Sequence, residues 1–505
     1  MQIEPQTTAF AKRYARGEAQ VVWTTLVSDL ETPVSAFLKI ADGRPMSFLL
    51  ESVEGGAVRG RYSIIGLDPD LIWRAIAGRA EINRTARDTG DGFSPCNEAP
   101  LSALRAVIAE SRIDLPEPLP PMAAGIFGYL GYDMVRLMEE LPRPNPDPIG
   151  IPDAVLVRPT VVVVFDSVTD TITVVTPVRP QAGTAAEIAF ARATDRLSAI
   201  VDALDAPLVH APPNLKAGPL TVWPSSNTTP VEYERMVKAA KEYIAAGDVF
   251  QVVLSQRFEA PFELPPFALY RALRRINPAP FLYFLDFDDF SIAGSSPEIL
   301  VRVREGTVTI RPLAGTRARG STPQQDKALE LELLADPKER AEHLMLLDLG
   351  RNDVGRVART ATVKVTDQFS VERFSQVMHI VSNVEGQLDS KYDALDALAA
   401  GFPAGTVSGA PKVRAMEIID ELEKDKRGLY AGSVGYFSAA GELDSCIVLR
   451  TALIRNGMMY VQAGAGIVAD SSPKSEQQEC VDKAKALFRA AEEAKRFASA
   501  GRRGQ

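Results

Sequence analysis

Histidine, cysteine and tryptophan are rare in this 505-residue sequence, which has only three of each. So few histidines exclude a histidine-rich metal site. The cysteines Cys96, Cys446 and Cys480 form no CxxC pair and no even set for a disulfide framework. We therefore expect them to be reduced thiols.

Long apolar runs and long runs of one charge are also missing. The first twenty residues lack the apolar core of a signal peptide, and the longest apolar stretches, Val161 to Phe165 and Leu344 to Leu347, are far too short to span a bilayer. The net charge of −9 comes from interspersed charges of both signs, and no basic run could follow a phosphate backbone. We expect a cytoplasmic protein that binds neither membrane nor nucleic acid.

The length and composition predict a folded chain of two to three domains, because 505 residues exceed one ordinary core. Proline, serine and glycine interrupt every period between Ala206 and Asn227, as is typical of a connector. We predict an N-terminal β-rich domain over residues 1–215, a second domain over 225–492, and a C-terminal tail over 493–505.

Short strands dominate the predicted N-terminal domain. Ser47 to Val53 and Arg61 to Gly66 have strand patterns, and two further strands pair as a hairpin around Ser167 to Asp170. After the connector, Thr229-Pro230-Val231-Glu232 reads as a capping box that begins a helix, with Gly247 as its C′ residue. Helices and strands alternate beyond it.

A helix that begins at Asp336-Pro337 carries the first candidate metal ligand. Its centre is apolar on nearly every side, which predicts a buried helix. Glu342 lies in this apolar part, and a buried carboxylate costs several kcal/mol unless a cation compensates it. The cation could be a metal or an arginine such as Arg340 or Arg351, and the spacing leaves both alternatives open.

The last predicted helix, from Ser472-Pro473, carries Glu476, Glu479 and Lys483 along one side. The simpler interpretation is an exposed pair between Glu479 and Lys483. Two carboxylates from separate helices are nevertheless what a Mg²⁺ site shared with a substrate carboxylate requires.

The segment Gly464 to Ala469 matches the dinucleotide-binding pattern G-x-G-x-x-A. We reject that interpretation because no helix opens at these glycines and no acidic residue follows about twenty residues on. Accessible backbone amides that could hold an anion remain. His379 lies in an apolar, strand-like segment, where a histidine is more often a core residue than a general acid.

Several segments together resemble the chorismate-utilising enzymes. They are PLAGTRARG from Pro312, DPKERAEHLMLLDLGRND from Asp336, VMHIVSNVEG from Val377, FPAGTVSGAPKVRAMEII from Phe402, RGLYAGSVGYF, CIVLRTAL and VQAGAGIVADSSPKSEQQE. LLES, RYSIIG and GIFGYLGYD in the first half look like the N-terminal domain of anthranilate synthase component I. The resemblance implies an α+β fold with two large β-sheets packed between helices and an active site in a cleft of the C-terminal part.

The resemblance also assigns roles to individual residues. Glu342 and Glu479 match Mg²⁺-binding glutamates. Glu298 matches a general acid for a departing hydroxyl, while His379 and Thr406 match residues tied to pyruvate elimination or substrate positioning. Chorismate-binding positions are matched by Gly315, Thr316, Tyr430, Arg450, Gly464, Ala465, Gly466 and Lys483.

Two positions at which this chain differs from related enzymes indicate which reaction it catalyses. Isochorismate-forming relatives carry a lysine base where this chain has Gln251, which cannot act as a base at neutral pH. Aminodeoxychorismate synthases typically carry a nucleophilic lysine where this chain has Ala314. The resemblance thus implies direct attack of ammonia on chorismate and release of anthranilate and pyruvate. An aminodeoxychorismate synthase and a catalytically silent tryptophan sensor are the rival interpretations.

A partner and a regulator are implied as well. The chain has no G-x-C-x-G elbow, so a glutamine amidotransferase subunit would supply ammonia, with a heterotetramer expected. Leu49-Leu50-Glu51-Ser52 matches a tryptophan-binding motif, although taken alone the segment favours a strand with a buried glutamate. Phe281 and Leu282 depart from the Tyr-Met that relatives often carry. The expected tryptophan-binding set is Glu51, Ser52, Pro280, Phe281, Leu282, Val434 and Cys446.

Overall fold

The structure is a computed structural model that describes residues 1–499 except 55–57, 88–91, 209–223 and 375–376. Most of the predicted connector, the predicted boundary at residue 215 and His210 lie outside the described residues. So does the end of the predicted tail. Within that tail, the last helix, α11 (Pro473–Ser499), continues past residue 492.

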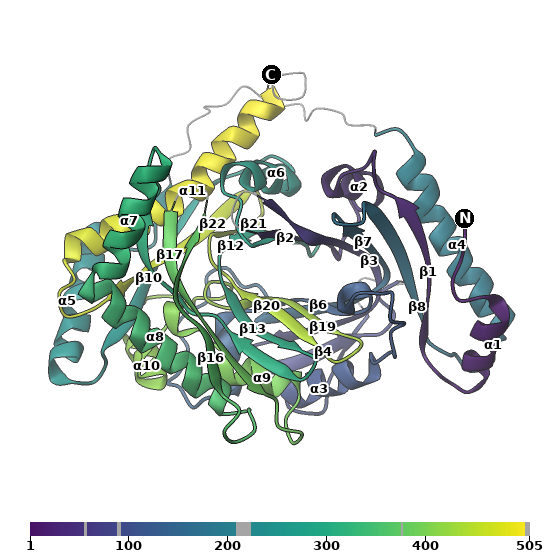
Figure 1. The fold of residues 1–505 in the computed structure, drawn as a ribbon, viewed down its shortest axis with the longest axis horizontal. Helices are drawn as coiled ribbons and strands as arrows, with labels where there is room; N and C mark the ends of the chain where they lie inside the picture. Colours follow the sequence, from purple (N-terminus) through teal and green to yellow (C-terminus); the bar gives the residue numbers. More distant parts are fainter. Residues whose placement is uncertain (55–57, 88–91, 209–223, 375–376, 500–505) are drawn as a thin grey trace.

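Antiparallel strands form two large sheets, which share two long strands (Figure 1). In the first sheet, pairing runs in the order β10-β22-β21-β12-β11-β2-β3-β7-β8-β1, with β9 and β18 against the free side of β10. The strands of this sheet are β1 (Gln20–Val27), β2 (Ser47–Glu54), β3 (Val58–Ile76), β7 (Ala154–Asp166), β8 (Thr171–Val178), β9 (Ser225–Ser226), β10 (Gln251–Pro261), β11 (Phe281–Asp286), β12 (Ser291–Ser296), β18 (Gly409–Ala410), β21 (Thr451–Arg455) and β22 (Met458–Ile467).

The second sheet continues from the other ends of β3 and β7. Its order is β5-β4-β3-β7-β6-β19-β20-β13-β14-β17, with β15 following β14 along one edge of β17 and β16 along the other. Its remaining strands are β4 (Arg79–Asn83), β5 (Phe93–Pro95), β6 (Gly125–Leu130), β13 (Ile299–Arg304), β14 (Thr307–Ile310), β15 (Leu313–Ala318), β16 (Lys364–Arg373), β17 (Val377–Gln387), β19 (Ser433–Ser438) and β20 (Leu443–Ile447).

The shared strands explain how two sheets form from one hydrogen-bonded network. The pairing of β3 with β7 shifts register between Pro69 and Leu71, opposite Pro159. Proline lacks an amide hydrogen, so a ladder that contains two prolines is interrupted there and can bend. The network of 22 strands in the described part of the chain therefore divides into two sheets that stay joined through β3 and β7.

Helices cover the outer faces of both sheets, and the three largest apolar clusters of the described residues lie between these layers. The first core packs α1 (Thr7–Ala15), α2 (Pro33–Ile40), α4 (Ala186–Asp205), α6 (Pro266–Ile276) and α11 against the first sheet. The second packs α3 (Pro100–Glu110), α8 (Pro337–Gly355), α9 (Ala394–Gly401) and α10 (Lys412–Leu422) against the second sheet. The third lies between the sheets. The α+β prediction of two sheets packed between helices is confirmed.

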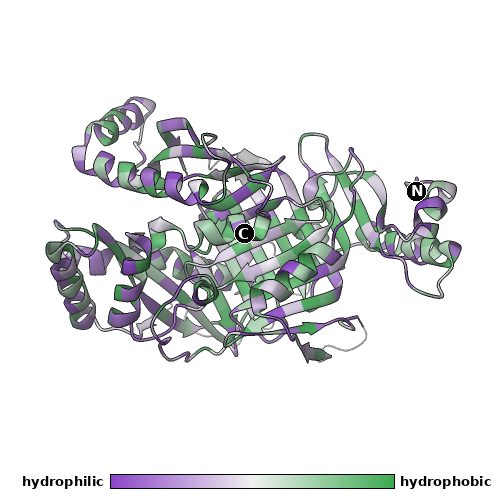
Figure 2. Ribbon diagram, turned by 90° about the horizontal axis from the view of Figure 1, so that it is seen from below, coloured by the Kyte–Doolittle hydropathy of each residue, from purple (hydrophilic) through white to green (hydrophobic). Residues whose placement is uncertain are grey.

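Burial on both faces explains the apolar strands of the sequence. In β3, Ile65 faces the helices while Ile64 faces the other sheet, and β7 alternates in the same way. Such strands need apolar residues at every position rather than at alternate ones. Figure 2 shows the result, with hydrophobic residues concentrated along the central strands.

The predicted hairpin turn and the predicted helix ends at Thr229 and Gly247 are confirmed. The hairpin around Ser167 to Asp170 joins β7 to β8. Thr229 and Glu232 form the predicted reciprocal cap of α5 (Pro230–Ala246), and Gly247 ends that helix with a φ of 88°. The remaining helix, α7 (Pro323–Ala335), packs beside α8. Three short 3₁₀ turns are Pro121–Ala123, Tyr132–Leu137 and Gly405–Val407.

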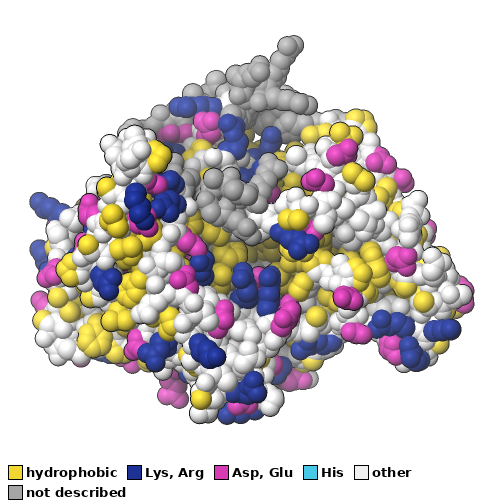
Figure 3. Space-filling view, viewed as in Figure 1, with side chains coloured by type: hydrophobic (Ala, Val, Ile, Leu, Met, Phe, Trp, Pro, Cys, Tyr) yellow, Lys and Arg dark blue, Asp and Glu magenta, His cyan; other side chains and the backbone are white. Residues whose placement is uncertain are grey.

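The prediction that the helix after Asp336 is buried on nearly every side is wrong. Leu347 is buried, but Leu344 is 52% exposed and Asp348 is exposed as well. The reason is that α8 lies on the outside of β15 and β17 and therefore buries only one side. Figure 3 shows acidic and basic side chains interspersed over the visible face. No helix of the described chain is long and apolar enough to cross a membrane.

Candidate active site

A cavity of about 640 Å³ lies beside α8 and α11, at the edges of β10, β15, β17 and β22. It collects nearly all the predicted catalytic, chorismate-binding and metal-binding residues, although they come from segments more than 200 residues apart. They are Gln251, Glu298, Gly315, Thr316, Glu342, His379, Thr406, Tyr430, Arg450, Gly464, Gly466, Glu479 and Lys483. Ala465 does not line the cavity, because its side chain packs in the core on the opposite face of β22.

Glu342 and Glu479 approach each other from α8 and α11. Gln251 donates to Glu342 through its side-chain amide, with 3.0 Å between Nε2 and Oε1. Burial and the nearby carboxylates of Glu339 and Glu479 raise the pKa of Glu342. A divalent cation between Glu342 and Glu479 would offset this repulsion. The pair therefore fits a divalent ion, although no three acidic, cysteine or histidine side chains of the described chain group closely enough to hold a metal alone.

The alternative that an arginine compensates Glu342 is wrong. Arg351 pairs with Asp348, and Arg340 lies over the Phe369 ring. The simpler interpretation of the last helix, by contrast, is confirmed: Lys483 and Glu479 form a half-exposed ion pair of 2.7 Å. Such a pair is weak, so it leaves Glu479 free to exchange Lys483 for a metal ion.

Glu298 is the most deeply buried carboxyl of the cavity, with 4% of its surface exposed. The Thr406 hydroxyl donates to one oxygen at 3.1 Å and the Leu313 amide to the other at 3.3 Å. Burial raises the pKa of Glu298 to about 8, and no basic side chain offsets that effect. At neutral pH the carboxyl is therefore protonated and can donate a proton.

His379 lies on β17 with its ring facing the cavity. Its Nδ1 is 3.0 Å from the Gly315 carbonyl oxygen, which can only accept, so Nδ1 carries the hydrogen. Burial and the nearby charge of Arg450 lower the His379 pKa to about 4. The ring is therefore neutral, and its Nε2 is a buried acceptor without a partner in the described structure.

Arg450 brings an uncompensated charge to the cavity. Burial lowers its pKa, and no carboxylate or hydrogen-bond acceptor of the described chain meets its guanidinium group. Its backbone φ of 47° lies in the left-handed region, which a non-glycine residue adopts at a cost. An unpaired guanidinium held in this way is suited to a carboxylate ligand.

Two glycines leave the cavity its space. A Cβ at Gly466 would come within 2.5 Å of the Gln251 amide nitrogen, so a larger residue would displace the group that holds Glu342. Gly315 has a φ of 71°, which only glycine adopts readily. That backbone amides of the Gly464 to Gly466 segment hold an anion stays a prediction.

Comparison with known proteins bears on this arrangement. Residues 61–489 match the family described as chorismate binding enzyme. The chain is 56% identical to anthranilate synthase component 1 of Cereibacter sphaeroides over 97% of this chain and 98% of the relative. The chain belongs to the anthranilate synthase component 1 family of chorismate-binding enzymes.

Other members of the family are similarly close. Anthranilate synthase component 1 of Aquifex aeolicus is 48% identical over 93% of this chain and 94% of its own. The solved structure of component I from Streptococcus pneumoniae aligns with a TM-score of 0.75 and 38% identity, covering 92% of this chain and 99% of that one. The family fold predicted from the sequence is thereby confirmed.

The cavity also contains residues that the sequence prediction missed. Lys338 lies one turn before Glu342 on α8, and its charge lowers the Glu342 pKa. Glu339 and Gln462 line the wall as well. The i,i+4 spacing of Lys338 and Glu342 is a signal that could have identified the lysine. Gln462 lies on the same face of β22 as Gly464 and Gly466, but its sequence pattern resembles that of any polar strand residue.

The predicted tryptophan residues do not line this cavity, and those on β11 lie on both faces of the first sheet: Leu282 packs in the core under the helices, whereas Phe281 faces the core between the sheets. In the pairing of β2 with β11, Ser52 lies opposite Phe281 and Glu51 opposite Leu282. Phe281, Val434 and Cys446 meet in the core between the sheets. The Ser52 hydroxyl donates to the Tyr62 carbonyl, and the buried Glu51 receives hydrogen bonds from Arg274 at 2.6 and 2.8 Å and from Tyr270. The alternative of a strand with a buried glutamate is therefore correct as a description, and the role in tryptophan binding stays a prediction.

Proposed function

We propose that this protein converts chorismate and ammonia to anthranilate and pyruvate, and so begins the committed path to tryptophan. The observation that supports this most directly is the pairing, in one cavity, of a protonated carboxyl at Glu298 with an unpaired guanidinium at Arg450. Chorismate is a dicarboxylate with a hydroxyl that must leave. The cavity therefore offers both a carboxylate receptor and an acid.

Arg450 and Lys483 are the cations available to the substrate carboxylates. The Lys483 ammonium donates to the Gly464 carbonyl at 2.9 Å, which holds it against the glycine strand. Binding a carboxylate would compensate the buried charge of Arg450 and so relieve an existing cost. Tyr430 then forms an apolar wall beside the ring of the substrate.

Glu342 and Glu479 would hold Mg²⁺. Bound there, the ion would neutralise and orient the ring carboxylate of chorismate. Gln251 keeps Glu342 in place by donating a hydrogen bond to it. Because this glutamine cannot remove a proton from water, addition of water is disfavoured.

Glu298 is the proposed acid for the departing hydroxyl. As the nitrogen of ammonia bonds to one end of the conjugated ring, the hydroxyl at the other end takes the Glu298 proton and leaves as water. Thr406 orients the carboxyl by its hydrogen bond. The unprotonated Nε2 of His379 is suited to accepting a hydrogen bond or proton during the loss of pyruvate. Pyruvate loss makes the ring aromatic.

Ala314 separates this reaction from that of an aminodeoxychorismate synthase. It lies on β15 in the cavity wall and has no amine with which to attack the ring. The silent-sensor alternative is disfavoured because a sensor has no use for a buried, unpaired Arg450. Ammonia would come from glutamine on a component II amidotransferase subunit, in a cytoplasmic heterotetramer.

Tryptophan would inhibit from the region where β2 meets β11. A short chain of contacts joins that region to the cavity: the Ser295 hydroxyl donates to the Asn277 carbonyl, and the Ser295 amide donates to the Arg450 carbonyl at 3.2 Å. Asn277 begins the segment that carries Pro280 to Leu282. Movement of that segment would therefore act on the backbone of Arg450.

The test is to incubate the protein with chorismate, Mg²⁺ and an ammonium salt and to record anthranilate fluorescence. We expect a fluorescent product and an equal amount of pyruvate, both abolished by removing Mg²⁺. An amino product without pyruvate would identify an aminodeoxychorismate synthase instead. Absence of any turnover with intact chorismate binding would favour the sensor.

A further inference from the structure

Arg427 lies beneath the cavity, between α10 and β19, with 1% of its side chain exposed. Its guanidinium group forms a bidentate pair with Glu423, with distances of 3.0 and 2.7 Å. It also donates to the Val407 carbonyl at 2.7 Å and to the Val253 carbonyl at 2.6 Å. A guanidinium group is a rigid planar fork, so these contacts fix its orientation.

The groups that Arg427 contacts belong to the walls of the cavity. Val253 is on β10, two residues after Gln251, and Val407 directly follows Thr406. The guanidinium carbon also lies 5.4 Å from the centre of the Tyr430 ring and 4.9 Å from that of Tyr132. One buried side chain therefore joins three separate segments of the cavity wall.

Glu423 extends the same network. One of its oxygens accepts hydrogen bonds from the Ser255 amide at 2.7 Å and hydroxyl at 2.9 Å. Ser255 in turn accepts a hydrogen bond from Gln462 at 2.8 Å, and Gln462 lines the cavity. The pair thus reaches a fourth part of the wall through Ser255.

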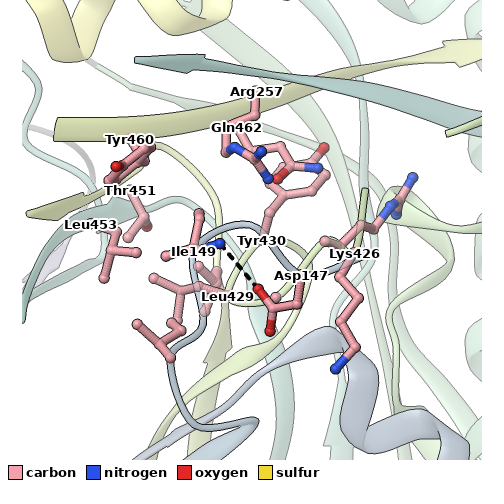
Figure 4. A pocket seen from close by; sticks show the side chains of 14 residues that line it. Asp147, Ile149, Arg257, Lys426, Leu429, Tyr430, Thr451, Leu453, Tyr460 and Gln462 are labelled. Atoms are coloured by element: carbon pink, nitrogen blue, oxygen red, sulfur yellow. Dashed lines mark hydrogen bonds between the residues drawn. The ribbon is translucent and has the colours of Figure 1, made fainter. Parts of the chain in front are cut away.

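Tyr430 is the aromatic residue of the cavity wall that Arg427 contacts. It also lines a second, smaller cavity of about 30 Å³, and Figure 4 shows Tyr430 there with Gln462, Arg257 and Lys426. That volume is enough for about one water molecule. The position of Tyr430 therefore affects the walls of both cavities.

We propose that the Arg427–Glu423 pair is a positioning element for chorismate, which holds Tyr430, Thr406 and Gln251 in register through the ring and carbonyl contacts described above. The inference rests on the proposed function, because it takes chorismate as the ligand of the cavity. Burial of the pair for stability alone is a weak explanation, since a buried ion pair is often no more stabilising than apolar residues of similar size.

Arg427→Lys separates positioning from stability. Lysine keeps the positive charge beside Glu423 but cannot donate to two carbonyls and both carboxylate oxygens in one plane. Misplacement of a cavity wall by about 1 Å costs about 100-fold in rate. We expect Arg427→Lys to lower kcat/KM by at least about 30-fold and to weaken chorismate binding by about 10-fold. Binding is measured by calorimetry with Mg²⁺ and without ammonia, so that no reaction occurs.

Arg257→Lys is the matched control. Arg257 is also a buried arginine with one carboxylate partner, Asp425 at 2.7 Å, but it borders only the smaller cavity. We expect this variant to lose similar thermal stability while its kcat/KM and chorismate Kd stay within about threefold of the wild type. Equal losses of activity in both variants, or wild-type constants in folded Arg427→Lys, would overturn the proposal.

Glu423→Gln keeps the inference testable if Arg427→Lys does not fold. The amide places an N–H against the guanidinium fork, so we expect chorismate binding to weaken by about fivefold. Unchanged binding and turnover in Glu423→Gln would also overturn the proposal. A wild type that binds chorismate but makes no anthranilate would contradict the proposed function. The chorismate affinities of the variants, measured by calorimetry, would still decide the role of Arg427.

Discussion

The cavity beside α8 and α11 and the predicted tryptophan region differ in how their buried polar groups are paired. In the cavity, the Gln251 carbonyl oxygen and His379 Nε2 are buried without a partner in the described chain, and the half-buried Arg450 meets no carboxylate there. Between β2 and β11, Glu51 is bound by Arg274 and Tyr270, and the Ser52 hydroxyl by a carbonyl. An unsatisfied buried group costs stability, whereas a satisfied one contributes to it.

This difference indicates what each region does in the absence of ligand. The cavity holds strained and unpaired groups that a ligand would satisfy, which is the usual condition of a reacting site. The second region is already complete, so a ligand there must replace existing contacts. We therefore expect substitutions in the cavity to change rates, and substitutions near Ser52 to change only the response to tryptophan.

The largest effect should follow loss of a metal ligand. Glu342→Gln and Glu479→Gln each remove a charge that would hold Mg²⁺, so we expect activity to fall by at least about 1,000-fold. Circular dichroism should show an unchanged fold, and titration with Mn²⁺ by paramagnetic resonance should show weaker metal binding. Retention of Mg²⁺-dependent activity in either variant would contradict the assignment.

Arg450→Met should separate rate from stability most clearly. Removing an unpaired, half-buried charge is expected to leave the free energy of unfolding no lower than in the wild type, while loss of the carboxylate receptor lowers kcat/KM by about 100-fold. Urea unfolding and steady-state kinetics measure the two quantities. A variant that is both less stable and inactive would show that Arg450 has a structural partner.

Glu298 should control the pH dependence of the rate. Since only its protonated form can donate, and its pKa is raised to about 8, kcat/KM should fall about tenfold per pH unit above that value. The free energy of unfolding should also fall as pH rises. Glu298 loses its proton at a lower pH in the unfolded state than in the folded state, so the fall extends from about pH 4.5 to about pH 8. Urea unfolding at pH 5 and pH 8 should show that Glu298→Gln loses this dependence.

The smallest effect on uninhibited turnover is expected for substitutions at Ser52. A Cβ on neighbouring Gly60 would come within 2.3 Å of the Ser52 hydroxyl, so there is little space beside it. Ser52→Phe should raise the inhibitory tryptophan concentration about 5- to 150-fold and leave uninhibited turnover close to normal. Ser52→Ala is the matched control for loss of the hydroxyl. Unchanged inhibition in Ser52→Phe, or a wild type that ignores tryptophan, would show that this site has been misplaced.

The sequence predicted features whose cause is local and missed those that depend on packing. The cap at Thr229 and the hairpin around Ser167 follow from short-range hydrogen bonds, and both are present. The exposure of Leu344 depends on which side of the second sheet α8 covers, which periodicity cannot tell. Likewise, the resemblance placed Gln251 in the active site, but only the structure pairs it with Glu342.

The two long strands shared by the sheets bear on how the chain folds. Because β3 and β7 each run through both sheets, and β2 pairs with β11 across more than 200 residues, neither half can complete its core alone. A fragment that ended at the predicted domain boundary would expose unpaired strand edges, which favour aggregation. Pairings so distant along the chain form slowly. We therefore expect the two halves to fold in a single late step, and separately expressed halves to become soluble only when produced together.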